Sequence, residues 1–142
     1  MEITKKKVTE EYIFSDNTGV RTNTKEVVKW FVRANAFSFT ANFKDHSLYD
    51  NAFPLDLTIE VSSPNWNITF AIENNNSDIN VPTYTHSASP FLPNKKQLDK
   101  FTEHLYDVAT FWHVKNAWAT DDTGKMLMLH EIAHLIELIL FT

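Results

Sequence analysis

Regular alternation of apolar and polar residues, the pattern of a β-strand with one covered face, recurs along the first half of the chain. It is most regular in residues 37–43, where Phe-Ser-Phe-Thr-Ala-Asn-Phe switches at every position. Residues 57–61 and 66–72 alternate in the same way on either side of a proline-containing turn, which predicts an antiparallel hairpin. A weaker alternation in residues 8–14, closed by Asp-Asn-Thr-Gly at 16–19, predicts a first strand.

Residues 24–35 carry a different pattern, which predicts a helix directly after the first strand. Asn23 and Glu26 stand three positions apart, the spacing of a capping box in which Asn23 is the N-cap. Trp30 would lie at the edge of this helix. The apolar residues that the helix would bring to one face are Val27, Val28, Phe31 and Val32.

Two more helices are predicted in the last third of the chain. Asn94 follows a proline and can cap a helix that runs to about residue 119. Thr-Asp-Asp-Thr-Gly at 120–124 ends this helix, and a last helix follows from about residue 125 to residue 141. Residues 74–93, which contain three prolines and three consecutive asparagines, are predicted to form a long connection.

Together these elements predict an α+β fold in a single domain of residues 1–142. The sheet is expected to have roughly four strands, largely antiparallel, with one helix after the first strand and two C-terminal helices packed on it. The short loop between the last two helices favours their packing as neighbours. Apolar residues occur all round the last helix, which favours a homodimer formed through it.

The composition limits the kinds of partner and the cellular compartment that are expected for the protein. The formal net charge of −5 disfavours direct nucleic-acid binding, which relies on lysine and arginine neutralising phosphates, and favours a basic protein partner. Cysteine is absent, so disulfides and cysteine zinc sites are excluded and the cytoplasm is the expected location. Residues 126–141 are too few and too polar to span a membrane. The abundance of Asn, Lys, Phe and Ile is typical of an AT-rich gene, such as those of low-GC bacteria and their phages.

His-Glu-Ile-Ala-His at 130–134 is the one motif in the chain that points to a particular chemistry. On a helix, histidines four positions apart share a face, so two imidazoles can bind one zinc ion while the glutamate activates a water molecule. The motif resembles the HExxH of the zincin metallopeptidases. This resemblance implies that His130 and His134 are zinc ligands and that Glu131 is the general base.

The resemblance covers five residues, and the longer metzincin pattern is not continued, since Glu137 stands where glycine is needed. A third ligand would have to come from upstream. The candidate histidines are His86, His104 and His113. The alternative interpretation is a solvent-facing polar stripe on an otherwise apolar helix, formed by His130, Glu131, His134 and Glu137.

Two further groups of residues are candidates for binding. Asp99, Glu103 and Asp107 recur every four residues, so their carboxylates form a row about 6 Å apart along one helix face. That spacing resembles successive phosphates and would suit a mimic of nucleic acid, while an ordinary solvated face is the alternative. The second group consists of aromatic and imidazole side chains in the long connection, namely Tyr84, His86 and Phe91.

The preferred hypothesis is a small non-enzymatic binding or inhibitor protein that acts on a macromolecular partner or ligand without a cofactor. Anti-defence and immunity proteins of phages and mobile elements are of this kind. The alternative is a zinc-dependent metallohydrolase or peptidase that uses residues 130–134. A structural subunit of a particle is a third hypothesis. Phosphate-binding loops and the nucleophile elbow are excluded, because the chain contains two glycines and neither motif.

Overall fold

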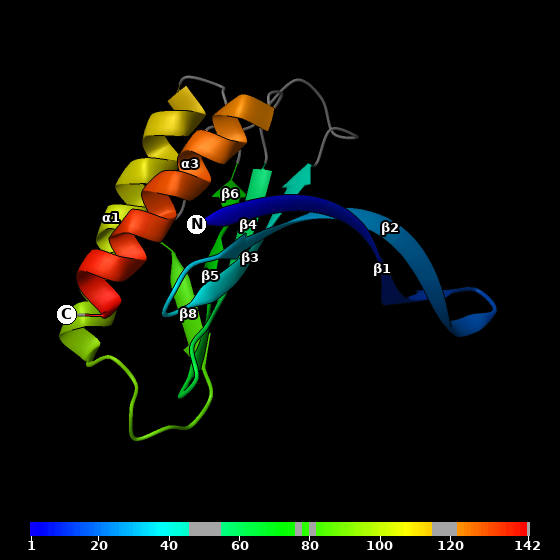
Figure 1. Cartoon of the computed structure of the whole chain (residues 1–142). Helices are drawn as coiled ribbons and strands as arrows, with labels where there is room; N and C mark the ends of the chain where they lie inside the picture. Colours follow the sequence, from blue (N-terminus) through cyan, green and yellow to red (C-terminus); the bar gives the residue numbers. More distant parts are fainter. Residues whose placement is uncertain (46–54, 76–77, 80–81, 115–121, 142) are drawn as a thin grey trace.

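The structure is a computed structural model of the chain that describes residues 1–45, 55–75, 78–79, 82–114 and 122–141. A six-stranded antiparallel sheet carries the helices on one of its faces (Figure 1). The elements in chain order are β1 (Glu2–Asp16), β2 (Gly19–Arg33), β3 (Ser38–Asp45), β4 (Leu55–Ser62), β5 (Asn67–Ile72), β6 (Asn74–Asn75), β7 (Asp78–Ile79), β8 (Thr83–His86), α1 (Lys95–Val114), α3 (Asp122–Leu135) and the π-helix η2 (Ile136–Leu140).

The strand order in this sheet is β1-β2-β3-β4-β5-β8, and each neighbouring pair is antiparallel. The predicted hairpin is confirmed, with Leu57 of β4 opposite Ile72 of β5 and Val61 opposite Ile68. The alternating apolar residues of these two strands face the helices and form the centre of the core. Those buried to 1% exposure or less are Leu57, Ile59, Val61, Ile68, Phe70 and Ile72.

The helix predicted for residues 24–35 is wrong, because residues 24–33 belong to β2, all 15 residues of which pair with β1, and residues 34–35 lie in the turn that follows. The Asn23 side chain caps no helix here and instead accepts a hydrogen bond from the N–H of Thr24 at 2.8 Å. β-Branched and aromatic residues are frequent in the segment and favour extended backbone. Trp30 and Val32, two positions apart, are the side chains that β2 buries in the core.

The number of strands also exceeds the roughly four that were predicted. Two differences account for this: the predicted helix is the strand β2, and residues 74–93 contain the edge strand β8. β8 pairs with β5, with Tyr84 opposite Phe70. At four residues, β8 is too short for its alternation to be recognised. β6 and β7 form a separate two-stranded ribbon.

The two C-terminal helices, α1 and α3, pack beside each other over the sheet (Figure 1). The prediction that Asn94 caps α1 is confirmed. Its Oδ1 accepts a hydrogen bond from the N–H of Gln97, whose Oε1 accepts one from the N–H of Asn94, both at 2.9 Å. Gln97 also donates from Nε2 to the carbonyl of Ile139 at 3.1 Å, which ties the start of α1 to the end of η2. Residues 115–119 of the predicted helix lie outside the described residues.

Aromatic and aliphatic side chains join the helices to the sheet. The ring of Phe101 in α1 lies 4.6 Å from that of Phe70 in β5, centroid to centroid, and both side chains are fully buried. α3 and η2 bury most of their apolar residues in the same cluster, so this chain itself covers much of the last helix. Leu127 and Leu138 remain about half exposed. Among the described helices, none has the length and apolar character needed to cross a membrane.

The hairpin formed by β1 and β2 extends well beyond the rest of the sheet. β2 pairs with β3 only over residues 30–33. Residues 6–16 of β1 and 19–29 of β2 therefore pair only with each other among the described residues. Figure 1 shows this two-stranded arm curving away from the helices and the other strands. A two-stranded ribbon has no core of its own, so the arm depends on its backbone pairing and on side-chain contacts along its faces.

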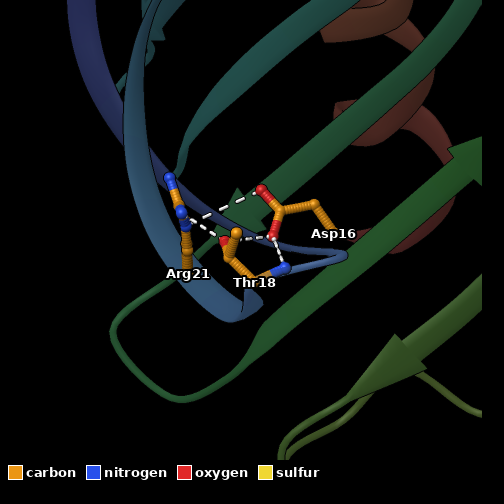
Figure 2. A network of polar contacts seen from close by, with 3 residues as sticks. All are labelled: Asp16, Thr18 and Arg21. Atoms are coloured by element: carbon orange, nitrogen blue, oxygen red, sulfur yellow. Dashed lines mark hydrogen bonds and ion pairs between the residues drawn. The ribbon is translucent and has the colours of Figure 1, made fainter.

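A compact network of polar contacts closes the tip of the arm (Figure 2). The Oδ1 atom of Asp16 accepts hydrogen bonds from the N–H and the hydroxyl of Thr18 at 2.8 and 2.5 Å. These bonds lower the pKa of Asp16, since they stabilise its charged form. Arg21 donates to the Thr18 hydroxyl and lies 3.6 Å from Asp16 Oδ2. Gly19 follows with φ of 117°, a backbone conformation that other residues rarely adopt.

Candidate functional site

The last helix turns its polar residues away from the core. Its buried side is formed by Gly124, Met128, Leu129, Ile132 and Ala133. His130, Glu131 and His134 are all exposed. His130 and His134 share one face because they are four positions apart, and Glu137 follows on the same side one turn later. Glu137 lies in η2, a wider π-helical turn of a kind that frequently occurs at functional sites.

A cleft of about 660 Å³ lies between this polar face, the turn that joins β2 to β3, and the N-terminal residue. Ligand sites commonly have volumes of about 300–1,000 Å³, so the cleft has the size of a binding site. Figure 1 shows the N-terminus beside α3, in keeping with its place in the cleft wall. The residues that line the cleft are Met1, Ala34, Asn35, Ala36, Phe37, His130, Ala133, His134, Glu137 and Phe141.

Stacked aromatic rings form the floor of the cleft. Phe37 and Phe141 lie with their ring centroids 5.3 Å apart and nearly parallel. Trp66, which does not itself line the cleft, packs against Phe141 with its ring centroid 5.4 Å away. Phe37 and Trp66 are buried, whereas Phe141 is 36% exposed and forms the accessible part of the floor. The floor is therefore an apolar surface at the end of the core.

The β2–β3 turn forms the opposite wall. The N–H of Ala34 donates to the carbonyl of Phe37 at 2.9 Å, which closes the turn. Asn35 and Ala36, at its apex, are exposed. This wall offers one amide side chain and otherwise small apolar groups. Because the turn is anchored at both ends in the six-stranded sheet, its distance from α3 is set by the core.

The cleft combines an apolar floor with a polar wall that can both donate and accept hydrogen bonds. A neutral imidazole has one donor and one acceptor nitrogen, and a carboxylate has only acceptors. His130, His134 and Glu137 thus suit an apolar group that carries an amide or basic group beside it. The two histidines, four positions apart on one helix face, are also spaced as two ligands of a divalent transition metal.

The remaining residues of the zinc hypothesis are not brought to the cleft. Glu131 is exposed, but it is not one of the residues that line the cleft. His86 in β8 and His104 in α1 also lie outside its walls. Within the described parts of the chain, no three His, Asp or Glu side chains are close enough together to hold one metal ion. The side chain of His113 lies outside the described residues.

The acidic row of α1 lies on a mixed surface rather than a purely acidic one. Asp99 pairs with Lys95 at 2.8 Å, and this contact raises the pKa of Lys95. Glu103 and Asp107 are exposed. A shallow hollow over the first turns of the helix is lined by Lys95, Lys96, Asp99, Lys100, Glu103 and His104. The lysines offset much of the negative charge that a mimic of nucleic acid would need.

The three aromatic and imidazole candidates near β8 do not form one site. Tyr84 is half-buried and packs against Phe70, with ring centroids 6.1 Å apart. The ring of His86 stacks on Tyr84 at 6.4 Å, and its Nδ1 lies 3.0 Å from the carbonyl of Ser87. Phe91 is 67% exposed in the segment before α1. None of these residues lines the cleft.

Of the residues that line the cleft, only those of the helical wall could be predicted from the sequence. The floor and the turn consist of apolar and small residues from distant parts of the chain, namely Phe37, Phe141, Ala34 and Ala36. Such residues carry no motif, and only the fold brings them together. Comparisons of this chain with protein-family models, with curated proteins and with solved structures found no match.

Proposed function

We propose that this chain is a small non-enzymatic binding protein and that its cleft holds part of a macromolecular partner. The observation that carries the proposal is the cleft itself, in which His130, His134 and Glu137 stand over a floor of stacked aromatic rings. Apolar pockets with a few converging polar groups are typical binding sites. Glu131, the residue that a hydrolase would need as its base, does not line the cleft, which favours binding over catalysis.

The chemistry of the cleft also indicates the kind of partner. The apolar floor would take an aliphatic or aromatic side chain of a protein, and the polar wall would bond to an adjacent backbone or basic group. The carboxylate of Glu137 and the net charge of −5 both favour a basic partner. We place this activity in the cytoplasm, where a cysteine-free protein needs no disulfides. Inhibitors and immunity proteins of phages and mobile elements are the functional type that fits best.

Blocking the cleft should weaken binding. Ala36 lies at the exposed apex of the β2–β3 turn and lines the cleft, so Ala36→Trp would fill the opening without disturbing the core. Peptides selected by phage display for binding to the intact chain should bind this variant at least about tenfold more weakly. The measurement is isothermal titration calorimetry with the selected peptides.

Ala88→Trp is the matched control, because Ala88 is also exposed but does not line the cleft. This variant should bind the selected peptides as the unmodified chain does. Peptides that bind all three proteins with equal affinity would show that the cleft is not the recognition site and would contradict the proposal.

Zinc-dependent hydrolysis is the second candidate function. One observation favours it: His130 and His134 line the same cleft at the spacing of two zinc ligands. In such an enzyme the metal would activate water, and Glu131 would accept its proton. The polar wall would then bind a peptide substrate rather than a stable partner.

Metal content and the Glu131→Gln variant separate the two functions. A zinc enzyme requires one zinc ion per chain in tag-free protein, lost on combining His130→Ala with His134→Ala, and measured by mass spectrometry. It also requires that Glu131→Gln abolish cleavage of any peptide that the chain binds. We expect instead that Glu131→Gln leaves peptide affinity within about twofold of the unmodified chain and that no cleavage occurs in either protein, because Glu131 lies outside the cleft.

A further inference from the structure

The outer edge of β1 is the longest unpaired strand edge among the described residues. β1 ends the six-stranded sheet, and within the described part of the chain its 15 residues pair with β2 on one side only. Long free edges are uncommon in natural proteins, because their unpaired N–H and C=O groups bind other strands. Two apolar side chains of the same hairpin, Ile13 and Val20, are 74% and 75% exposed.

The backbone bonds of the sheet determine which residues of β1 face this edge. At the end of the β2–β3 pair, Ala34 donates to Phe37, so the even-numbered residues of β2 bond to β3. The odd-numbered residues of β2 therefore bond to β1, and their partners there, such as Lys6 opposite Lys29, are even-numbered. The odd-numbered residues of β1 direct their N–H and C=O groups to the free edge.

We propose that this edge pairs with the same edge of a second copy of the chain, antiparallel and about a two-fold axis at Val8. An antiparallel pair of identical strands is symmetric, and it forms hydrogen bonds only when odd-numbered residues stand opposite odd-numbered ones. With Val8 opposite Val8, this condition is met. Lys5 then stands opposite Glu11, and Lys6 opposite Glu10, in both halves of the pair.

The charges select this register over its neighbours. A shift of two residues in one direction places Lys7 opposite Lys7 and leaves neither glutamate opposite a lysine. The opposite shift centres the pair on Thr9 and retains only Lys7 opposite Glu11 in each half. Lysines on a free edge normally discourage pairing between chains. In this strand each of two lysines is matched by a glutamate at the position that the two-fold axis relates to it.

Apolar contacts support the same register. Ile13, exposed in the arm, comes opposite Ile3, which packs against the core on the helix-bearing side of the sheet. The arm of one copy would thus lie along the body of the other and cover part of its own exposed apolar surface. Its turn would lie just past Met1, at the end of the sheet where the cleft opens. The pairing is independent of what the cleft binds.

Ion pairs within the chain are compatible with this arrangement. Lys5 contacts Asp122 at the start of α3 at 2.8 Å, which lowers the pKa of Asp122, and Lys29 contacts Glu10 at 2.9 Å. In the dimer Lys5 would stand between two carboxylates, and Glu10 between two lysines. The lysines beside Glu10 would come from the two strands that flank β1, whereas the carboxylates beside Lys5 would come from α3 and from the partner's strand. In both arrangements neighbouring charges have opposite sign, which is favourable.

A proline on the free edge tests the backbone part of the proposal. Thr9 is odd-numbered, so Thr9→Pro removes an N–H that the dimer needs while leaving the bonds between β1 and β2 in place. Sedimentation velocity of the full chain, over a dilution series, should show a dimer for the unmodified chain and for the control Thr9→Ala. Thr9→Pro should be monomeric. A monomer for the unmodified chain at every concentration, or an oligomer that survives Thr9→Pro, overturns the proposal.

Charge reversal tests the register and does not depend on proline being tolerated. One variant combines Lys5→Glu with Lys6→Glu, and the other combines Glu10→Lys with Glu11→Lys. Each alone places like charges opposite each other and should dimerise at least about tenfold more weakly than the unmodified chain. An equimolar mixture restores four opposite-charge pairs and should form a heterodimer of the original affinity. Failure of the mixture to associate, while both variants remain folded by circular dichroism, overturns the register and with it the proposal.

Discussion

Replacing Phe101 with alanine is expected to lower the free energy of unfolding by about 3–5 kcal/mol. Phe101 is fully buried where α1 meets the sheet, with its ring 4.6 Å from that of Phe70. The substitution removes apolar surface from the core and leaves a cavity that the β5 backbone cannot close, because β5 is held between β4 and β8. Chemical denaturation followed by circular dichroism measures the change.

Phe91→Ala is the control for this measurement. Phe91 lies shortly before α1 and is 67% exposed, so its loss should change the free energy of unfolding by no more than about 0.5 kcal/mol. If the two variants were equally stable, α1 would not pack on the sheet through Phe101. The position of α3, which packs beside α1, would then have to be reconsidered together with the cleft that α3 borders.

The strands that sequence analysis predicted correctly have one face on the core and one face open. In residues 57–61 and 66–72, burial forces every second residue to be apolar, so the pattern in the sequence records the structure directly. The capping box at the start of α1 is equally local, because Asn94 and Gln97 bond to each other's backbone. Both kinds of element can be recognised from a few neighbouring residues.

β2 could not be recognised in this way, because most of it lies in the arm. Among the described residues, 19–29 pair with β1 alone and none of them belongs to the buried core, so burial does not impose an alternating pattern on this segment. The capping-box spacing of Asn23 and Glu26 therefore had no competing signal. What decides the conformation is the pairing with β1, which begins next to the turn at residues 17–18 and continues without a break. Such pairing between strands outweighs local propensity and is not visible in a short window of sequence.

In the candidate site too, residues that are close in the sequence could be predicted, whereas residues that only the fold brings together could not. His130, Glu131 and His134 could be identified because the motif occupies five consecutive residues of one helix. The fold separates these three residues, since the two histidines line the cleft and Glu131 does not. Which of them share a site depends on where the β2–β3 turn lies, and that turn was hidden by the predicted helix. Because residues 24–35 were predicted to form a helix, neither the arm nor the wall of the cleft formed by the β2–β3 turn could be predicted.

Substitutions at Trp30 and Phe31 test most directly whether residues 24–33 form a strand. β2 and the predicted helix give opposite orders for the effects of the two substitutions on the free energy of unfolding. In β2 adjacent side chains face opposite sides of the sheet. Trp30 is 4% exposed in the core, whereas Phe31 is half-buried on the other face. Trp30→Ala should therefore lower the free energy of unfolding by about 3 kcal/mol or more. Phe31→Ala should lower it by only about 1 kcal/mol.

A helix over residues 24–35 would reverse this order, since it places Phe31 on the buried face and Trp30 at the edge. Denaturation of both variants in parallel decides between the two arrangements, with each serving as the control for the other. A larger loss for Phe31→Ala would restore the helix and remove the arm. It would also remove the free edge of β1, because β1 would then have lost β2, the one strand among the described residues that pairs with it.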